Sequence, residues 1–205
     1  MRTLTKELQN NISPENALQI LKDGNLRFMS NIKMNRNLLQ QVNETTVSQH
    51  PFAVIISCMD SRTSAELIFD QGLGDIFSIR IAGNIINEAI IGSAEFGCKV
   101  VGSKIIAVIG HTSCGAIKGA IKKVDLGHLH FITSKIQRCI PEEMEFNEIN
   151  AEEMERMVTI NNIRQGIKDL RSQSSILEDM VYKNEIKIVG GLYDIASGKV
   201  EFFEK

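Results

Sequence analysis

The sequence predicts an α/β fold in which a mostly parallel central sheet of about five strands is flanked by helices. Short apolar runs alternate with segments of helical periodicity after the first 50 residues, which is the pattern of parallel strands joined by helices. Only DIASGK separates the last two runs, so we expect the final strand to be antiparallel at a sheet edge. The chain has 205 residues, 43% of them hydrophobic, which is enough for one core. We expect one domain over residues 1–205, with an N-terminal helical arm at 1–50 and an α/β core at 51–205.

The predicted arm contains one clear helix. Ser13 has the side chain of an N-cap, and Pro14 suits the first helical position. Apolar residues then recur on one stripe, so an amphipathic helix is predicted from Ser13 to Met29. Residues 31–50 read as a polar connection with a short helix at Leu38 to Val42, able to reach a neighbouring subunit.

The core is expected to contain five strands and six helices. The strands are the apolar runs Phe52 to Ser57, Ile76 to Ile81, Lys104 to Ile109, Ile186 to Tyr193 and Lys199 to Phe203. The helices are the segments Ser64 to Phe69, Ile86 to Lys99, Cys114 to Lys122, Gly127 to Cys139, Ala151 to Leu170 and Ser174 to Lys183.

Charge and hydropathy exclude several classes of function. Lys and Arg number 23 against 25 Asp and Glu, so no basic field attracts nucleic acid or anionic lipid. The longest apolar runs, such as Ile105 to Gly110, are far shorter than the roughly 20 residues that span a bilayer. The N-terminus, MRTLTKELQNN, lacks the apolar region of a secretory signal. We therefore expect a cytoplasmic protein with no nucleic-acid or membrane partner.

The cysteines are too sparse for a disulfide scaffold. In a reducing compartment, cysteines are thiols, metal ligands or nucleophiles. We expect Cys98 and Cys139, which lie in or near amphipathic helices, to be ordinary buried thiols. We likewise expect no ligand role for His50, His128 and His130, although "HLH" resembles a ligand pair.

Two segments that follow strands carry the chemistry. "SCMDSR" ends the first strand and "GHTSCG" follows the third. Ligands of an open α/β sheet bind outside the carboxyl ends of its strands, so these segments can meet there. Cys58, His111 and Cys114 would form a Cys2His set, which is typical of zinc with a fourth position for water, substrate or another ligand.

Asp60 and Arg62 stand beside this set. At a surface they would form an ion pair of little consequence, worth about 0–1 kcal/mol. Beside a zinc site, the Asp60 carboxylate would be a fourth ligand or a proton acceptor. A bidentate guanidinium would hold it charged and oriented.

Both motifs together resemble the β-class carbonic anhydrases, whose signature is C-x-D-S-R followed by H-x-x-C-G. The resemblance extends from ALQILKDGNLRFM to GGLYDIASGKV, which is most of the chain. It implies one zinc ion per chain, bound by Cys58, His111 and Cys114, and hydration of carbon dioxide to bicarbonate and a proton. It also implies that Asp60 and Arg62 orient and deprotonate the zinc-bound water.

The resemblance also implies substrate contacts and an assembly. Gln49 matches a glutamine that reaches the substrate from the neighbouring subunit, and Phe77 and Ala82 lie in segments that wall a pocket for carbon dioxide. The backbone N–H of Gly115, at a helix start, is expected to donate to bicarbonate. A homodimer or homotetramer is implied, with the arm wrapped around a partner. Thr63 departs from the valine of many members, which should alter packing near the motif.

Three other functions compete with this interpretation. The first is a closed zinc site in a sensor or binding protein, with Asp60 as permanent fourth ligand. A second is hydrolysis of another linear substrate, such as carbon disulfide, on the same fold. A dinucleotide-binding domain is the third, and the first strand argues against it because it leads into SCMDSR rather than a G-x-G-x-x-G turn.

Overall fold

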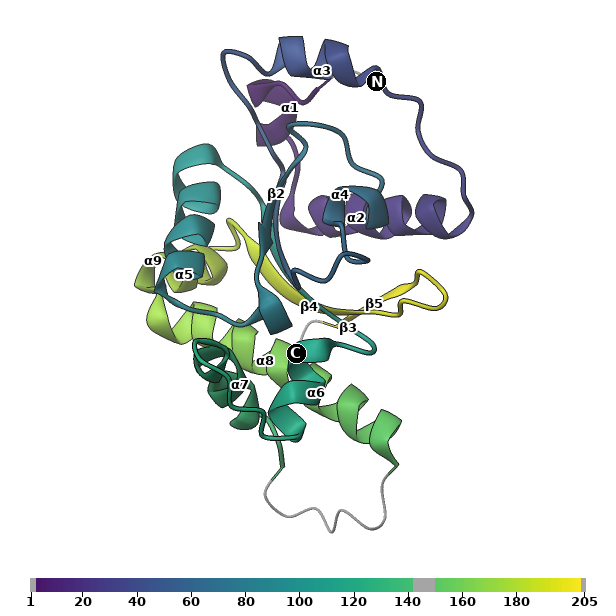
Figure 1. Cartoon of the computed structure of the whole chain (residues 1–205). Helices are drawn as coiled ribbons and strands as arrows, with labels where there is room; N and C mark the ends of the chain where they lie inside the picture. The colour runs from purple at the N-terminus through teal and green to yellow at the C-terminus, as the bar shows by residue number, and fades with distance from the viewer. Residues whose placement is uncertain (1–2, 142–149, 204–205) are drawn as a thin grey trace.

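A five-stranded sheet forms the centre of the molecule (Figure 1). The structure is a computed structural model that describes residues 3–141 and 150–203. The strands are β1 (Ala53–Ser57), β2 (Ile76–Arg80), β3 (Ile105–His111), β4 (Lys187–Tyr193) and β5 (Val200–Phe203). Their order is β2-β1-β3-β4-β5, and every neighbouring pair is parallel except β4 and β5. The predicted fold class is confirmed, including the antiparallel strand at one edge.

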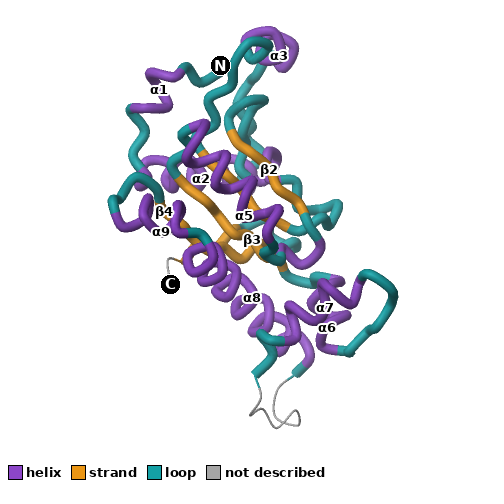
Figure 2. Tube along the Cα trace, turned by 90° about the vertical axis from the view of Figure 1, so that its left-hand side faces the viewer, coloured by secondary structure: helices purple, strands orange, loops and turns teal. Residues whose placement is uncertain are grey.

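Helices cover both faces of this sheet (Figures 1 and 2). The α-helices are α1 (Lys6–Asn10), α2 (Pro14–Met29), α3 (Leu38–Glu44), α4 (Ala65–Ile68), α5 (Glu88–Glu95), α6 (Gly115–Ile121), α7 (Leu129–Gln137), α8 (Ala151–Gln173) and α9 (Ser175–Tyr182). Two further turns are the 3₁₀ helix η1 (Ala82–Asn84) and the π-helix η2 (Phe96–Val101). Helices α2 and α4 pack on one face, and α5, η2, α8 and α9 pack on the other.

The strand order creates a switch point at the carboxyl end of the sheet. β1 lies between β2 and β3, so the chain leaves β1 toward one side and returns to β3 on the other. Both strands are buried along their whole length, as expected for parallel strands covered on two faces. Ser57 lies level with Ile109. The residues that follow Ser57 therefore meet the last residues of β3, where ligands of such sheets bind.

Several element boundaries differ from the sequence prediction. α1 and η1 were not predicted, and β3 continues to His111 because it pairs with β4 as far as Tyr193. The helix expected from Ile86 begins at Glu88, because the Asn87 side chain accepts a hydrogen bond from the Ile90 N–H at 3.0 Å and caps it.

Helix α2 of the predicted arm packs on the sheet of its own chain. Ala17 and Leu21 are fully buried in the core beneath it. The Asn25 side chain donates to the carbonyl of Gly198 at 2.9 Å and accepts from the N–H of Val200 at 2.8 Å. The apolar stripe of α2 is thus used within the chain. Wrapping of residues 1–50 around a partner stays a prediction.

A buried carboxylate ties the N-terminal segment to the core. Asp70, directly after α4, accepts from Arg27 Nε and Arg36 Nη1, both at 2.6 Å. Arg36 also donates to the Asp70 carbonyl. Burial would raise the pKa of Asp70, but the two guanidinium groups outweigh it and hold the pKa below its ordinary value.

Asp70→Asn is expected to lower the free energy of unfolding by about 2–3 kcal/mol at neutral pH, because it leaves two guanidinium groups without their anion. The pKa of Asp70 in the folded protein lies below its value of about 3.9 in the unfolded chain. The stabilisation of the folded state by the ionised carboxylate is therefore fully present above about pH 3.9 and is lost as the pH falls through the folded pKa. Urea unfolding at neutral and acidic pH measures this difference. Asp23→Asn, which alters an exposed acid on α2, is the control. An equal effect of both substitutions would contradict the prediction.

Candidate metal centre

Two strand ends bring together three side chains that could hold a metal ion. Cys58 follows β1, His111 is the last residue of β3, and Cys114 is the N-cap of α6. Ser113 adopts a left-handed conformation (φ 56°) in the turn between His111 and Cys114. The three are buried, at 4%, 1% and 2% exposure respectively. Their ligand atoms lie within 4.8 Å of one another, and within residues 3–141 and 150–203 no other such group occurs.

The geometry of this cluster fits a tetrahedral metal ion. The sulfurs of Cys58 and Cys114 are 3.9 Å apart. Two thiolates bound to zinc at about 2.3 Å with a tetrahedral angle would be about 3.8 Å apart, whereas a disulfide requires about 2.05 Å. His111 Nδ1 lies 2.9 Å from the Thr112 carbonyl, which can only accept, so Nδ1 carries the proton. Nε2 is therefore the ring nitrogen that is free to bind a metal, and it has no hydrogen-bond partner in the described part of the chain.

The two thiols of the cluster differ in acidity. Cys114 donates to the Cys58 sulfur, which lowers the pKa of Cys58 and raises that of Cys114, although burial opposes the lowering at Cys58. The N–H of Asp60, 3.4 Å from the Cys58 sulfur, and the N–H of Gly83 lower the pKa of Cys58 further. Cys58 is therefore stabilised as a thiolate, the form that binds metal.

The remaining cysteines and histidines lie outside the cluster. Burial raises the pKa of Cys98 to about 12 and that of Cys139 to about 11, so both stay protonated. His130 lies 3.6 Å from Asp125 at the surface, and His50 lies 3.3 Å from the Ser48 hydroxyl. None of these four residues belongs to the group of possible ligand atoms found in the described part of the chain.

Arg62 holds the Asp60 carboxylate in a bidentate pair. Its Nε lies 2.9 Å from Oδ1 and its Nη2 lies 2.7 Å from Oδ2, and the Arg62 N–H also donates to Oδ1 at 2.9 Å. These bonds hold the pKa of Asp60 well below its ordinary value. The carboxylate is not part of the group of ligand atoms. In this arrangement the protein supplies three donors, and Asp60 lies beside them as a charged acceptor.

Arg80, which the sequence analysis did not single out, and Thr63 brace the loop between Cys58 and Arg62. Arg80 donates from Nε to the Cys58 carbonyl at 3.1 Å and from Nη2 to the Asp60 carbonyl. The buried Thr63 hydroxyl lies 2.8 Å from the Cys58 carbonyl and 2.9 Å from the Asp60 carbonyl. Valine at position 63 would have no hydroxyl for these contacts, so the departure at Thr63 adds a polar brace.

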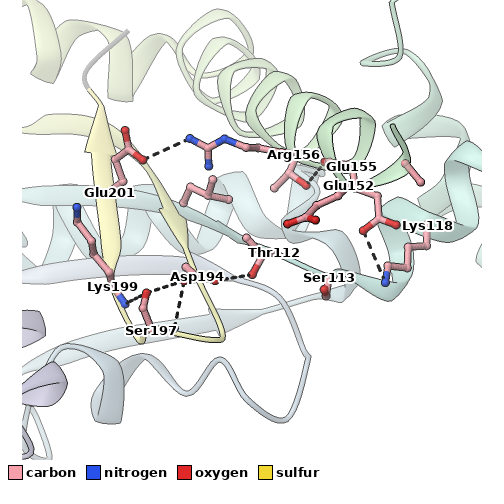
Figure 3. A pocket seen from close by; sticks show the side chains of 13 residues that line it. Thr112, Ser113, Lys118, Glu152, Glu155, Arg156, Asp194, Ser197, Lys199 and Glu201 are labelled. Carbon is pink, nitrogen blue, oxygen red and sulfur yellow. Dashed lines mark hydrogen bonds and ion pairs between the residues drawn. The ribbon is translucent and has the colours of Figure 1, made fainter. Parts of the chain in front are cut away.

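The hairpin between β4 and β5 supports His111 through Thr112. The Thr112 hydroxyl donates to Asp194 Oδ1 at 3.2 Å (Figure 3). It also accepts from the Ile195 N–H at 3.1 Å. These bonds fix Thr112, whose carbonyl accepts the hydrogen bond from the His111 imidazole. Thr112 also borders a pocket of about 760 Å³ whose walls carry both signs of charge and include none of the three ligand residues; its charged residues are Lys118, Glu152, Glu155, Arg156, Asp194, Lys199 and Glu201.

The predicted substrate residues are not all gathered around the cluster in one chain. Gln49 is exposed in the segment before β1. Phe77 pairs with Val54, four residues before Cys58, so it lies roughly 13 Å along the strands from the cluster. Its ring instead packs 6.3 Å from that of Phe96. A contact of Gln49 or Phe77 with substrate would therefore need a second chain, and both roles stay predictions.

Ala82 and Gly115 lie nearer to the cluster. Ala82 precedes Gly83, whose N–H interacts with Cys58. Gly115 directly follows Cys114. Apart from its chain neighbours and the backbone of its own helix, no atom of the described residues lies within 4 Å of the place that a β-carbon would occupy. The backbone at Gly115 thus has open space beside it.

Comparison with known proteins identifies the family. Residues 53–200 match the family model described as "Carbonic anhydrase". A carbonic anhydrase of Mycolicibacterium smegmatis is 32% identical over 194 residues, which cover 93% of this chain and 94% of the relative. The chain belongs to the β-carbonic anhydrase family. Carbonic anhydrase 2 of Mycobacterium tuberculosis is 31% identical over 194 residues, 92% of each chain.

Solved structures agree with this assignment. The β-carbonic anhydrase CcaA has a TM-score of 0.71 at 26% identity, covering 91% of this chain and 94% of that one. CafA, a β-carbonic anhydrase of Aspergillus fumigatus, has a TM-score of 0.73 at 26% identity, covering 80% of each chain. The resemblance inferred from the two motifs is confirmed, and the relatives support a carbonic anhydrase enzyme. In the described residues of this β-carbonic anhydrase, every helix is too short or too polar to cross a membrane.

Proposed function

We propose that this β-carbonic anhydrase catalyses the reversible hydration of carbon dioxide to bicarbonate and a proton, using one zinc ion per chain held by Cys58, His111 and Cys114. The observation that carries the proposal is the set of three buried donor atoms within 4.8 Å, beside a carboxylate that Arg62 keeps out of the set. Bound there, zinc would act as a Lewis acid and make water a nucleophile near neutral pH.

Asp60 is proposed to orient the attacking water. Because its pKa lies well below the ordinary range, the carboxylate remains an anion at neutral pH and accepts a hydrogen bond continuously. Such a group is a weak base, so we expect Asp60 to align the water while the released proton passes to solvent. The Asp60 and Arg62 side chains are 18% and 50% exposed, which places this pair between the buried cluster and solvent.

The substrate-binding residues complete this proposal. The backbone N–H of Gly115 is proposed to donate to an oxygen of bicarbonate, where the open space beside it leaves room. Ala82 would contribute to the wall of the same pocket. Gln49 and Phe77 would contribute from a neighbouring chain, since neither lies at the cluster of its own.

We also propose a homodimer or homotetramer as the working unit. Apolar side chains at and beyond α3 are exposed, among them Leu39 at 77% and Val47 at 97%. A solved chain that shares the fold, at 22% identity and a TM-score of 0.71 over 78% of this chain and 84% of that one, comes from two β-carbonic anhydrases of Sordaria macrospora that are described as tetrameric. A single-chain mass in sedimentation equilibrium would contradict this assembly.

Stopped-flow hydration of carbon dioxide, with zinc assayed on the same sample, tests the proposed function. We expect one zinc per chain and activity that rises between about pH 6.5 and 9, because the thiolates of Cys58 and Cys114 offset part of the cation's charge and make the water less acidic. Full zinc content without hydration at any pH would contradict the proposal. Carbon disulfide would then be the next substrate to test.

A further inference from the structure

The short turn η1 lies directly beside the metal centre and has a strained backbone. Gly83 and Asn84 are consecutive left-handed residues, with φ of 64° and 42°. Glycine adopts this conformation readily, but a residue with a side chain does so at a cost. Both residues are buried. Such a conformation persists only where the surroundings hold it in place.

The position of η1 bears on the metal centre. The turn contacts β1, which leads to Cys58, β3, which ends at His111, and α6, whose N-cap is Cys114. The turn is closely packed: a β-carbon on Gly83 would lie 2.7 Å from Ile136 Cδ1 and 3.2 Å from Ala116 Cβ. The turn thus lies between strands β1 and β3 and helices α6 and α7. A shift of η1 would therefore disturb the elements that position the three ligand residues.

A buried amide of helix α8 holds this turn. Asn162, only 5% exposed, donates from Nδ2 to the Gly83 carbonyl at 2.8 Å. The backbone of η1 is also tied by the Asn84 N–H, which donates to the Ile81 carbonyl at 2.9 Å. The bond between Asn84 and Ile81 is local, whereas the bond from Asn162 connects η1 to α8.

We propose that Asn162 is a positioning residue for the metal centre, because it fixes the Gly83 carbonyl and so holds η1 against the strands and helix that carry the cluster. This inference rests on the proposed zinc site. Groups that orient a metal ligand from outside the coordination sphere typically contribute about 10–100-fold in metal affinity. Loss of the Asn162 bond should therefore weaken metal binding without removing any ligand.

The chain offers a matched control at the adjacent position. Asn161 lies on the same helix and also donates from Nδ2 to a backbone carbonyl, that of Cys139 at 3.1 Å. That carbonyl is not part of η1 or of the cluster. Substitutions at the two asparagines therefore remove the same kind of bond from the same helix, and only the bond of Asn162 is made to η1.

The test compares Asn162→Leu, Asn162→Ser and Asn161→Leu with the wild-type chain. The zinc dissociation constant is measured by competition with a chromophoric chelator, and the thiolate-to-metal absorption is recorded on the cobalt(II)-substituted protein. We expect Asn162→Leu and Asn162→Ser to weaken zinc binding by about 10-fold or more and to shift the absorption band. Asn161→Leu should stay within about 2-fold of wild type with an unchanged band.

Wild-type affinity and absorption in a folded Asn162 variant would overturn the proposal. An equal loss in Asn161→Leu would also overturn it, because general loosening of α8 would then explain the effect. If circular dichroism shows that Asn162→Leu does not fold, Asn162→Ser decides by the same criteria, since the smaller side chain removes the bond without crowding the core. A wild-type chain that binds no zinc would instead overturn the proposed function, and this inference with it.

Discussion

Cys114→Ala is expected to abolish zinc binding and carbon dioxide hydration together. The substitution removes one of three protein donors, and Cys58 and His111 alone offer only two ligand atoms. A thiolate contributes both a bond and a negative charge to the site. Its loss should therefore reduce zinc affinity by well over about 100-fold, more than the loss of an orienting group outside the coordination sphere. Zinc content after dialysis and stopped-flow hydration on the same sample measure both effects.

Cys98→Ala is the matched control for this experiment. Cys98 is an equally buried cysteine in η2 and lies outside the cluster. Burial raises its pKa to about 12, so its thiol stays protonated at neutral pH. This variant should keep its zinc and its activity. If Cys114→Ala retained one zinc ion per chain, Cys114 would not be a ligand, and the proposed set of three zinc ligands would be wrong.

Asp60→Asn is expected to retain zinc and to lose most of its turnover, by about 10²–10⁴-fold in kcat. The amide presents an N–H₂ group where the carboxylate presents an acceptor, so it cannot align water with both oxygens or form the bidentate pair with Arg62. Zinc should remain because Asp60 is outside the ligand group. Kinetics across the pH range, with metal content, measure the two properties separately.

Arg62→Ala separates the charge of Asp60 from its orientation. This variant keeps the carboxylate but removes the group that lowers its pKa, so that pKa should rise toward its ordinary value while zinc is retained. Hydration should fall because the carboxylate is no longer held. Normal turnover in zinc-loaded Asp60→Asn would rule out the proposed role of the carboxylate, and unchanged kinetics in Arg62→Ala would rule out the orienting role of the guanidinium.

The sequence by itself determined the fold class and the donor set. Apolar runs and helical periods are local properties, so the strands that lead to Cys58 and His111 could be located within a few residues. The sequence also gives the types of donor group, two thiols and one imidazole, and this combination of donors favours zinc whatever the details of packing. The same holds for Asp60 and Arg62, because residues two positions apart at a strand end can reach each other through their own side chains.

Only the tertiary structure decided how this site is supported. Arg80 reaches the Cys58 carbonyl because the register sets it level with Ser57, and Asn162 reaches η1 because α8 crosses that end of the sheet. The choice of His111 Nε2 as ligand atom depends on the Thr112 carbonyl, which the β4–β5 hairpin holds in place. Apart from the contact between the adjacent residues His111 and Thr112, these contacts join residues that are distant in the chain and carry no local pattern. They arise from the register and packing of whole elements, and for that reason the motifs alone could not predict them.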